Sequence, residues 1–382
     1  MKRRICLAAV LLFLLCLSPI CAGAVEMNIP AKSALLMDVA TGTVLYEANA
    51  HEALRPASVT KVMTMLLIME AIDSGKIGWD DMVTASEAAA SKGGSQIYLK
   101  VGETMSVADM VKSIAVSSAN DCACAMAEHI AGSEDAFVEM MNNRAAQLGM
   151  QDTHFVNCTG LDDSEDAKNH LTSAYDIAVM SRQLLKYHPD IKKYTTIWMD
   201  TVRGGTFGLS NTNKMVRFYS GCTGLKTGFT SAAGYCLSAS AQRDNMELIA
   251  VVMGAATSPE RFSACKSMLD YGFANFAQVT PELPENASVP VKLGTEARVT
   301  AVPYNNEPLL VDKSQRSSVT TEVSLLPEVS APVSKGQRLG TLTVRSGEQV
   351  LSQIPLVAQQ TVPRLSWGDL FLQLLKQVCM SK

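Results

Sequence analysis

The sequence predicts an α/β (α+β) fold in which helices flank an antiparallel sheet, followed by a small all-β domain and a C-terminal amphipathic helix. Three observations support this prediction. Hydrophobic spacing alternates between strand and helix periods as far as Thr280, prolines and short β-type runs follow, and helical spacing returns at the C-terminus. A chain of 382 residues that is 47% hydrophobic is long enough to give each domain its own core.

The N-terminus has the composition of a secretory signal peptide. Basic residues at 2–4 precede an apolar run over 5–17, and Ala22-Gly23-Ala24 provides small residues for cleavage. A membrane anchor is the alternative, but the run falls short of the roughly 20 apolar residues that a span requires. We therefore expect residues 1–24 to direct export and to be removed.

The charge of the chain limits its possible partners. The expected leader carries basic residues and no acidic ones, so its removal makes a chain of net charge −4 more acidic still. An acidic protein is a poor partner for nucleic acid, and we expect no nucleic-acid binding.

The ten cysteines do not form a disulfide framework. Cys6, Cys16 and Cys21 fall in the expected leader, and the remainder are odd in number and irregularly spaced, as buried small hydrophobic residues would be. Cys122-Ala123-Cys124 lacks the two intervening residues of a zinc knuckle, so we expect no metal site and no cofactor. So many free cysteines suit an anaerobic or weakly oxidising setting.

Strand and helix patterns alternate through the first domain, which we assign to residues 25–279. Two apolar runs around a turn at 38–42 predict a β-hairpin over 34–50. Helices are expected over the ranges 57–74, 106–130 with a break near 117–121, 134–148, 172–188 and 259–276. Strands are expected at 223–230, 235–242 and 246–254.

The C-terminal third divides into a β domain and a helical tail. Residues 280–357 show short β runs punctuated by Pro, Gly and Asn, and no helical segment is expected there. One helical face of residues 358–382 collects the apolar side chains Trp367, Leu370, Phe371, Leu374, Leu375 and Val378. This segment is too short to span a bilayer, so it either lies on the membrane surface or packs on the β domain. We favour the membrane surface, and hence expect an exported protein at the outer face of the cytoplasmic membrane.

The stretch RPASVTKVMTMLLIME, residues 55–70, places a hydroxyl and an amine in an otherwise apolar helix. Ser58 and Lys61 lie three residues apart and therefore share one helical face. A serine is a weak nucleophile until a base takes its proton, and burial lowers the pKa of a lysine so that it can accept one. The pair thus fits a nucleophile and its base at a helix N-terminus, whose dipole favours developing negative charge.

The S-x-x-K pattern is weak alone, and Ser263 and Lys266 repeat it without supporting motifs nearby. Two further patterns accompany the first one. Ser118-Ala119-Asn120 lies at the break between two helical segments, and Lys226-Thr227-Gly228 lies on a predicted edge strand, where glycine allows a substrate backbone to approach. These three patterns in this order are typical of penicillin-binding proteins and class A β-lactamases.

On these motifs the chain resembles the low-molecular-mass penicillin-binding proteins, the serine-type D-alanyl-D-alanine carboxypeptidases, over essentially its whole mature length. Further matching stretches are ALLMDVATGTVLYEANA, HFVNCTGLDD, LTSAYDIA, SNTNKM and GLKTGFTSAAGYCLSASA. The β domain and the amphipathic tail look like that family's stalk and membrane anchor. The resemblance implies a penicillin-binding/β-lactamase-like transpeptidase fold, a peptidoglycan pentapeptide as substrate and β-lactam antibiotics as inhibitors.

The resemblance also implies how the bond between the last two D-alanines would be cleaved. Ser58 would attack the carbonyl and form an acyl-enzyme, with Lys61 as the base. Ser118 would relay a proton to the leaving amine, and Asn120 would hold Lys61 and the substrate amide. Water would then hydrolyse the ester.

Substrate binding is expected along the Lys226-Thr227-Gly228 element. Backbone N–H groups of Ser58 and Phe229 would form the oxyanion hole. The terminal carboxylate would be bound by Lys226, Thr227 and Arg261. Phe229 stands where some relatives carry histidine, which leaves the backbone donor in place.

Three other functions fit parts of the pattern. A class A β-lactamase needs a glutamate in an E-x-x-L-N loop, and the chain has no Leu-Asn dipeptide. A D,D-transpeptidase or endopeptidase would use the same acyl-enzyme. A non-catalytic β-lactam-binding or cell-wall-binding protein would most simply have lost a motif residue, and none is lost here.

Overall fold

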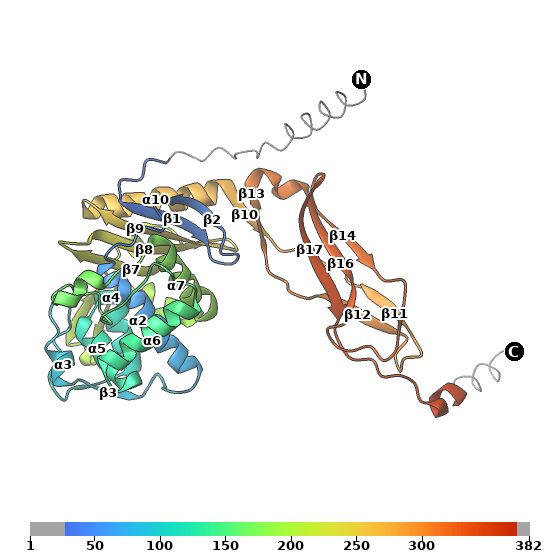
Figure 1. The fold of residues 1–382 in the computed structure, drawn as a ribbon, viewed down its shortest axis with the longest axis horizontal. Coiled ribbons are helices and arrows are strands. Elements are labelled where there is room, and N and C mark those ends of the chain that lie inside the picture. The colour runs from blue at the N-terminus through green and yellow to red at the C-terminus, as the bar shows by residue number, and fades with distance from the viewer. Residues whose placement is uncertain (1–26, 373–382) are drawn as a thin grey trace, which may run out of the picture.

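The structure is a computed structural model that describes residues 27–372, which form two domains (Figure 1). The signal peptide expected at 1–24 lies outside the described residues. Among residues 27–372, no helix combines the length and the apolar composition needed to cross a bilayer.

A five-stranded antiparallel sheet forms the centre of the N-terminal domain (Figure 1). Its strands are β1 (Ser33–Asp38), β2 (Val44–Ala48), β7 (Cys222–Thr230), β8 (Gly234–Arg243) and β9 (Met246–Ala255). Their order is β2-β1-β9-β8-β7, so the predicted hairpin over 34–50 and the three predicted strands after 221 are confirmed, and the strand with the K-T-G pattern lies at an edge.

Alternate residues of the strands face two separate cores, as the two-residue period of a strand requires. On one face Leu36 and Val252 pack with helix α10 (Ser258–Asn275). On the other face Leu35 and Val251 join the larger core of the remaining helices. Figure 1 shows α10 on one side of the sheet and the helical layer on the other.

The helical layer contains the longer helices that the sequence predicts. They are α2 (Lys61–Asp73), α4 (Val107–Ser117), α5 (Asn120–Ala131), α6 (Glu134–Gln147) and α7 (Ala174–Tyr187). The expected helix over 57–74 begins as a 3-10 turn, η1 (Ala57–Thr60), and Gly75 follows its end with a φ of +73°. The predicted break at 117–121 is confirmed, because Ser118 adopts a left-handed conformation between α4 and α5.

Several elements of three to five residues complete this domain, and the sequence did not predict them. The helical ones are α3 (Glu87–Ala90), η2 (Glu165–Asn169), η3 (Pro189–Ile191), α8 (Lys192–Thr195), η4 (Arg203–Gly205) and α9 (Met215–Phe218). The strands are β3 (Met82–Thr84), β4 (Thr104–Ser106), β5 (Met199–Val202) and β6 (Phe207–Ser210), which form two small two-stranded sheets.

The C-terminal domain is a β structure, as predicted, with one addition. Six strands pair in the order β14-β16-β17-β12-β11-β15. Their bounds are β11 (Ser288–Lys292), β12 (Arg298–Pro303), β14 (Val319–Leu325), β15 (Val329–Ser330), β16 (Arg338–Ser346) and β17 (Gln349–Ala358). The expectation of no helical segment in this domain is wrong, because residues Lys313–Ser318 form a 3-10 turn, η5, between two strands.

The two domains join through a short strand pair. β10 (Phe276–Val279) follows α10 directly and pairs with β13 (Leu309–Asp312). The amide of Gln278 donates to Asp38 on β1, and Lys313 donates to the carbonyl of Phe273 at the end of α10. The link between the domains is therefore ordered structure rather than a free linker.

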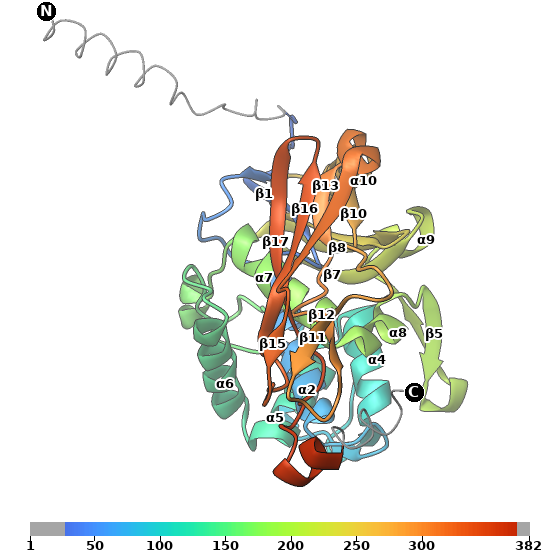
Figure 2. The same ribbon diagram turned by 90° about the vertical axis from the view of Figure 1, so that its right-hand side faces the viewer.

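The β domain extends beyond its last strand. Val362 pairs with Val333, and Arg364 pairs with Gly294. A helix begins at 367 and continues to 372, the last described residue, at the end of the β domain opposite β10 and β13 (Figures 1 and 2). Its Trp367 side chain is 89% exposed.

Candidate active site

The nucleophile and its predicted base lie at the junction of η1 and α2. Lys61 Nζ donates a hydrogen bond of 2.9 Å to Ser58 Oγ. Ser58 is half-buried, whereas Lys61 is completely buried at the start of a helix that is buried almost all round. The serine is thus accessible while its amine partner is shielded from water.

Burial changes the protonation of Lys61. Desolvation lowers the pKa of this amine from 10.5 to about 7, although the negative charge of Asp121 opposes the shift. A lysine with a pKa near neutrality is a competent general base. The serine-lysine pair that the sequence predicts therefore has both the geometry and the protonation that proton transfer requires.

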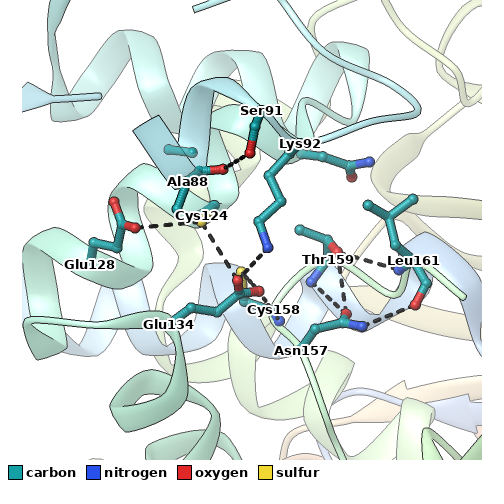
Figure 3. Close-up of polar contacts among 12 residues, drawn as sticks. Ala88, Ser91, Lys92, Cys124, Glu128, Glu134, Asn157, Cys158, Thr159 and Leu161 are labelled. Carbon is teal, nitrogen blue, oxygen red and sulfur yellow. Dashed lines mark hydrogen bonds and ion pairs between the residues drawn. The ribbon is translucent and has the colours of Figure 1, made fainter. Parts of the chain in front are cut away.

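A loop between α6 and α7 supplies the second partner of the amine, because Lys61 Nζ also donates to the carbonyl of Thr159 at 2.8 Å. Asn157 shapes this loop: its Oδ1 accepts from the N–H groups of Thr159 and Gly160, and its amide donates to the carbonyl of Leu161 (Figure 3). A carboxylate, that of Glu134, anchors the other side of the loop.

Glu134, at the start of α6, binds the loop at Cys158 (Figure 3). Its Oε1 accepts from the backbone N–H and the thiol of Cys158, and its Oε2 pairs with Lys92. Thr64 of α2 adds a hydrogen bond of 2.6 Å to the Cys158 carbonyl. Asn157, Glu134 and Thr64 together therefore hold the loop so that the Thr159 carbonyl faces Lys61.

Ser118 and Asn120 lie at the break between two helices, as predicted: Ser118 is in the turn after α4, and Asn120 is the first residue of α5. Ser118 has φ +63° and ψ +28°, a conformation uncommon for a serine, and is 3% exposed. Asn120 Nδ2 donates to the carbonyl of Gly93 at 2.7 Å, and its buried Oδ1 has no hydrogen-bond partner within residues 27–372. The hydrogen bonds of Lys61 in this part of the chain go to Ser58 and Thr159, not to Asn120 as the resemblance implied.

The Lys226-Thr227-Gly228 element on β7 packs against the nucleophile turn. A Cβ added to Gly228 would come within 2.6 Å of the Pro56 carbonyl oxygen and 3.1 Å of Ser58 N. Only glycine therefore allows this close approach. The backbone of β7 lies directly beside the N–H of the serine.

Lys226 is a second buried amine near the first. It is 1% exposed, and its Nζ donates to the carbonyl of Thr227 at 3.0 Å. Burial, and then the neighbouring Lys61 and Arg261, lower the pKa of this side chain well below its ordinary value. Such a cation gains most from an anion that enters the site.

Thr227 connects β7 to the end of α4. Its hydroxyl donates to Thr212 Oγ1 at 2.7 Å, and the Thr212 N–H donates to the carbonyl of Val116. Thr212 belongs to the stretch SNTNKM, one of those that matched the family pattern. The three motifs are thereby joined through hydrogen bonds and backbone contacts.

Arg261 and Phe229, both predicted to bind substrate, contact other parts of the protein with their side chains. Both hydrogen bonds of Arg261 within the described residues go to backbone carbonyls, those of Gly228 and Cys236. Arg261 thus holds β7 to β8 from the α10 side of the sheet. Phe229 is 51% exposed, and its ring packs against that of Tyr235 at a tilt of 31°, with ring centroids 4.3 Å apart.

The remaining sequence expectations concern the second S-x-x-K pattern and the cysteines. Ser263 is exposed, and its hydroxyl donates to the carbonyl of Glu260 within α10, so this serine is a surface residue. Of the described cysteines, all except Cys222 are buried, and all are free thiols. Cys379 lies outside the described residues.

Sequence reasoning missed the Thr159 carbonyl and the amide of Asn157. A backbone carbonyl carries no side-chain signal, so no residue pattern could have identified it. Both residues lie in the stretch HFVNCTGLDD, which matches the family pattern.

A serine paired with a buried lysine, beside a second buried lysine on the edge strand of an antiparallel sheet, defines a serine acyl-transfer enzyme of the penicillin-binding fold. The D-alanyl-D-alanine carboxypeptidase family, Peptidase_S11, matches residues 21–257. The family described as "Penicillin-binding protein 5, C-terminal domain" matches residues 282–364. The chain belongs to the D-alanyl-D-alanine carboxypeptidase family.

Individual relatives agree with this assignment. The chain is 44% identical to D-alanyl-D-alanine carboxypeptidase DacF of Bacillus subtilis, over 89% of this chain and 87% of the relative. Penicillin-binding protein 5 of Haemophilus influenzae superposes with a TM-score of 0.76 at 32% identity, over 90% of this chain and all of that one. Penicillin-binding protein D2 of Listeria monocytogenes, solved in its ampicillin-bound form, superposes with a TM-score of 0.57 at 31% identity, over 65% and 99% of the two chains.

Proposed function

We propose that this enzyme removes the terminal D-alanine from peptidoglycan stem pentapeptides through an acyl-enzyme on Ser58. The observation that carries the proposal is the hydrogen bond of 2.9 Å between Ser58 Oγ and a buried Lys61 whose pKa is about 7. Neutral Lys61 takes the hydroxyl proton as Ser58 Oγ bonds to the carbonyl carbon of the penultimate D-alanine.

The oxyanion formed in this step needs backbone donors. The N–H groups of Ser58 and Phe229 are the candidates, because Gly228 brings β7 into contact with the turn that carries Ser58. Each such donor contributes a few kcal/mol to transition-state stabilisation, by order of magnitude.

The leaving D-alanine requires a proton on its amine as the C–N bond breaks. Ser118, buried at the turn before α5, passes it from protonated Lys61. The unpartnered Oδ1 of Asn120 accepts an N–H of the substrate peptide, which satisfies that buried oxygen. Water then cleaves the ester and restores Ser58.

Recognition of a free carboxylate makes the enzyme a carboxypeptidase. Lys226 binds the terminal carboxylate together with the hydroxyl of Thr227, which turns from Thr212 Oγ1 to donate to it, and Arg261 contributes by holding the Gly228 carbonyl and by its positive charge. β-Lactams, which also carry a carboxylate beside a reactive carbonyl, acylate Ser58 in the same way.

We further propose that the protein is exported and works at the outer face of the cytoplasmic membrane. The composition of residues 1–24 and the exposed Trp367 at the start of the C-terminal helix support this. The helix at 367–372 then rests on the membrane surface, and the β domain serves as a spacer.

The test is D-alanine release by the protein without its leader. Diacetyl-L-Lys-D-Ala-D-Ala should lose D-alanine, and the matching C-terminal amide should react roughly 100-fold or more slowly, because it offers no anion to Lys226. Attachment of labelled penicillin without D-alanine release would replace the proposal with a binding function.

A further inference from the structure

His170 is a buried histidine directly behind the nucleophile turn that the mechanism above does not use. It is 3% exposed, and each ring nitrogen has one partner. Nδ1 lies 3.1 Å from the backbone nitrogen of Val156, and Nε2 lies 2.8 Å from Thr60 Oγ1. An amide N–H can only donate, so Nδ1 accepts from Val156 and the ring proton resides on Nε2.

The proton on Nε2 sets the direction of a short hydrogen-bond chain. His170 donates to Thr60 Oγ1, which leaves the hydroxyl hydrogen of Thr60 free to donate to the Ala57 carbonyl at 2.8 Å. Burial, then the charges of His154 and Lys61, lower the pKa of His170 to about 4. At the neutral pH at which Lys61 acts as a base, the imidazole therefore stays neutral. The hydrogen bonds from His170 to Thr60 and from Thr60 to Ala57 then keep their direction.

The last acceptor of this hydrogen-bond chain, the Ala57 carbonyl, belongs to the same peptide unit as the Ser58 N–H. Ala57 has a φ of +48°, in the left-handed region that a non-glycine residue rarely occupies. In a trans peptide the C=O of Ala57 and the N–H of Ser58 point in opposite directions. A hydrogen bond that fixes the carbonyl therefore also fixes the direction of the N–H.

The surroundings of this peptide agree with that geometry. A Cβ on Gly160 would lie 1.9 Å from the Ala57 oxygen, so this oxygen faces the 157–161 loop. A Cβ on Gly228 would lie 3.1 Å from Ser58 N, so the nitrogen lies beside β7. The carbonyl and the N–H thus face the two elements that bracket the nucleophile turn.

We propose that His170 and Thr60 are positioning residues that, through the Ala57 carbonyl, aim the Ser58 N–H at the oxygen of the reacting carbonyl. The inference rests on the proposed function, because it concerns the oxyanion that forms in that reaction. It gives His170 an indirect role, since the ring touches neither substrate nor Ser58.

The first test compares threonine variants in the mature chain. Thr60→Val removes both hydrogen bonds at nearly constant volume, and Thr60→Ser keeps the hydroxyl. Thr195→Val is the matched control, because Thr195 is also fully buried and donates to a backbone carbonyl, that of Thr223. The acylation rate by penicillin and the kcat and KM for D-alanine release are measured for all three, with thermal unfolding.

We expect Thr60→Val to lower the acylation rate and kcat about 10- to 100-fold with little change in KM, because a misdirected donor is lost mainly in the transition state. Thr60→Ser should stay near wild type. Thr195→Val should lower the melting temperature similarly without this kinetic effect. Equal kinetics for the two valine variants would overturn the inference.

A thiono ester substrate tests the oxyanion hole itself, because sulfur is a weaker hydrogen-bond acceptor than oxygen. The ratio of acylation rates for oxo and thiono esters should be large in the wild type and clearly smaller in Thr60→Val. An unchanged ratio would show that the variant fails for another reason and would overturn the inference.

Histidine variants provide the independent arm. His170→Phe removes both nitrogens, whereas the amide of His170→Gln can still donate to Thr60. His170→Gln should retain more of the oxo-to-thiono ratio than Thr60→Val does, and a ratio as low as that of Thr60→Val would contradict the proposed chain. If the wild type itself releases no D-alanine yet shows the expected ratios with esters, the proposed function fails and this inference stands.

Discussion

At the scale of single residues, the site depends on cations without acidic partners. Within the described part of the chain, Lys61, Lys226 and Arg261 form hydrogen bonds only to neutral oxygens. Burial disfavours the charged form of both lysines, and Lys61 and Arg261 disfavour it further for Lys226. Lys61 therefore serves as a base, whereas Lys226 is stabilised in its charged form by an anion that binds beside it. Burial therefore assists both proton transfer by Lys61 and carboxylate binding by Lys226.

The pKa of Lys61 predicts the pH dependence of acylation. Because the neutral amine is the base and its pKa is about 7, the acylation rate should rise through pH 7 as the lysine loses its proton. Stopped-flow measurement with a chromogenic cephalosporin gives this profile. A flat profile across neutral pH would contradict the role of Lys61, and Lys61→Arg, which stays protonated, should not acylate at any pH.

The side chains of the three motifs could be predicted from the sequence, and the groups that other parts of the chain bring to the site could not. Ser58, Lys61 and Lys226 belong to spacings that only a few enzyme classes share. The Thr159 carbonyl and the His170 ring reach the site through long-range packing, across 98 and 110 residues of sequence. The orientation of Arg261 toward the Gly228 carbonyl likewise depends on how α10 packs on the sheet.

At the scale of elements, the contact between β7 and η1 sets the width of the site. Gly228→Ala would bring a methyl group within 2.6 Å of the Pro56 oxygen, so one of the two elements must move. Since displacements of about 1 Å cost roughly 100-fold in rate, we expect a loss of at least this size in penicillin acylation. Gly208→Ala on β6 is the control, because a Cβ there meets no atom within 4 Å. Near-normal acylation by Gly228→Ala would contradict the contact.

Periodicity predicted the long elements because each repeats its apolar spacing several times. The helices over 57–74 and 134–148 and the strands that follow 221 needed no tertiary information. The pairs β3–β4 and β5–β6 contain three or four residues per strand, too few to establish a period. The 3-10 turn η1 at the nucleophile also has no periodic signal, because its geometry follows from contacts with Gly160 and Gly228.

At the scale of the whole molecule, the buried base reduces the stability of the fold. The folded pKa of Lys61, about 7, is below the unfolded value of 10.5, so the unfolded chain binds more protons between these values and stability rises with pH there. We expect Lys61→Met to be more stable than wild type by about 0.5–2 kcal/mol near pH 7 while inactive. Urea unfolding should show this difference shrinking toward pH 10, and a less stable variant at pH 7 would contradict the account.

The boundary between the β domain and the tail determines which C-terminal deletion leaves the β domain intact. Val362 and Arg364 form isolated bridges with Val333 and Gly294 of the β domain, so a deletion at Val362 would damage that domain. Deleting residues 366–382 should instead move the protein from the membrane fraction to the soluble fraction with carboxypeptidase activity unchanged. Fractionation identical to that of the full chain would contradict a membrane role for the tail.

The identity of the acylated residue tests the central claim most directly. The mature chain is incubated with benzylpenicillin, and the adduct is mapped by peptide mass spectrometry in the wild type and in Ser58→Ala. We expect one adduct, on the peptide that contains Ser58, and none in the variant. An adduct elsewhere, for example on the peptide that contains Ser263, or labelling that survives Ser58→Ala, would contradict the assignment of Ser58 as the nucleophile.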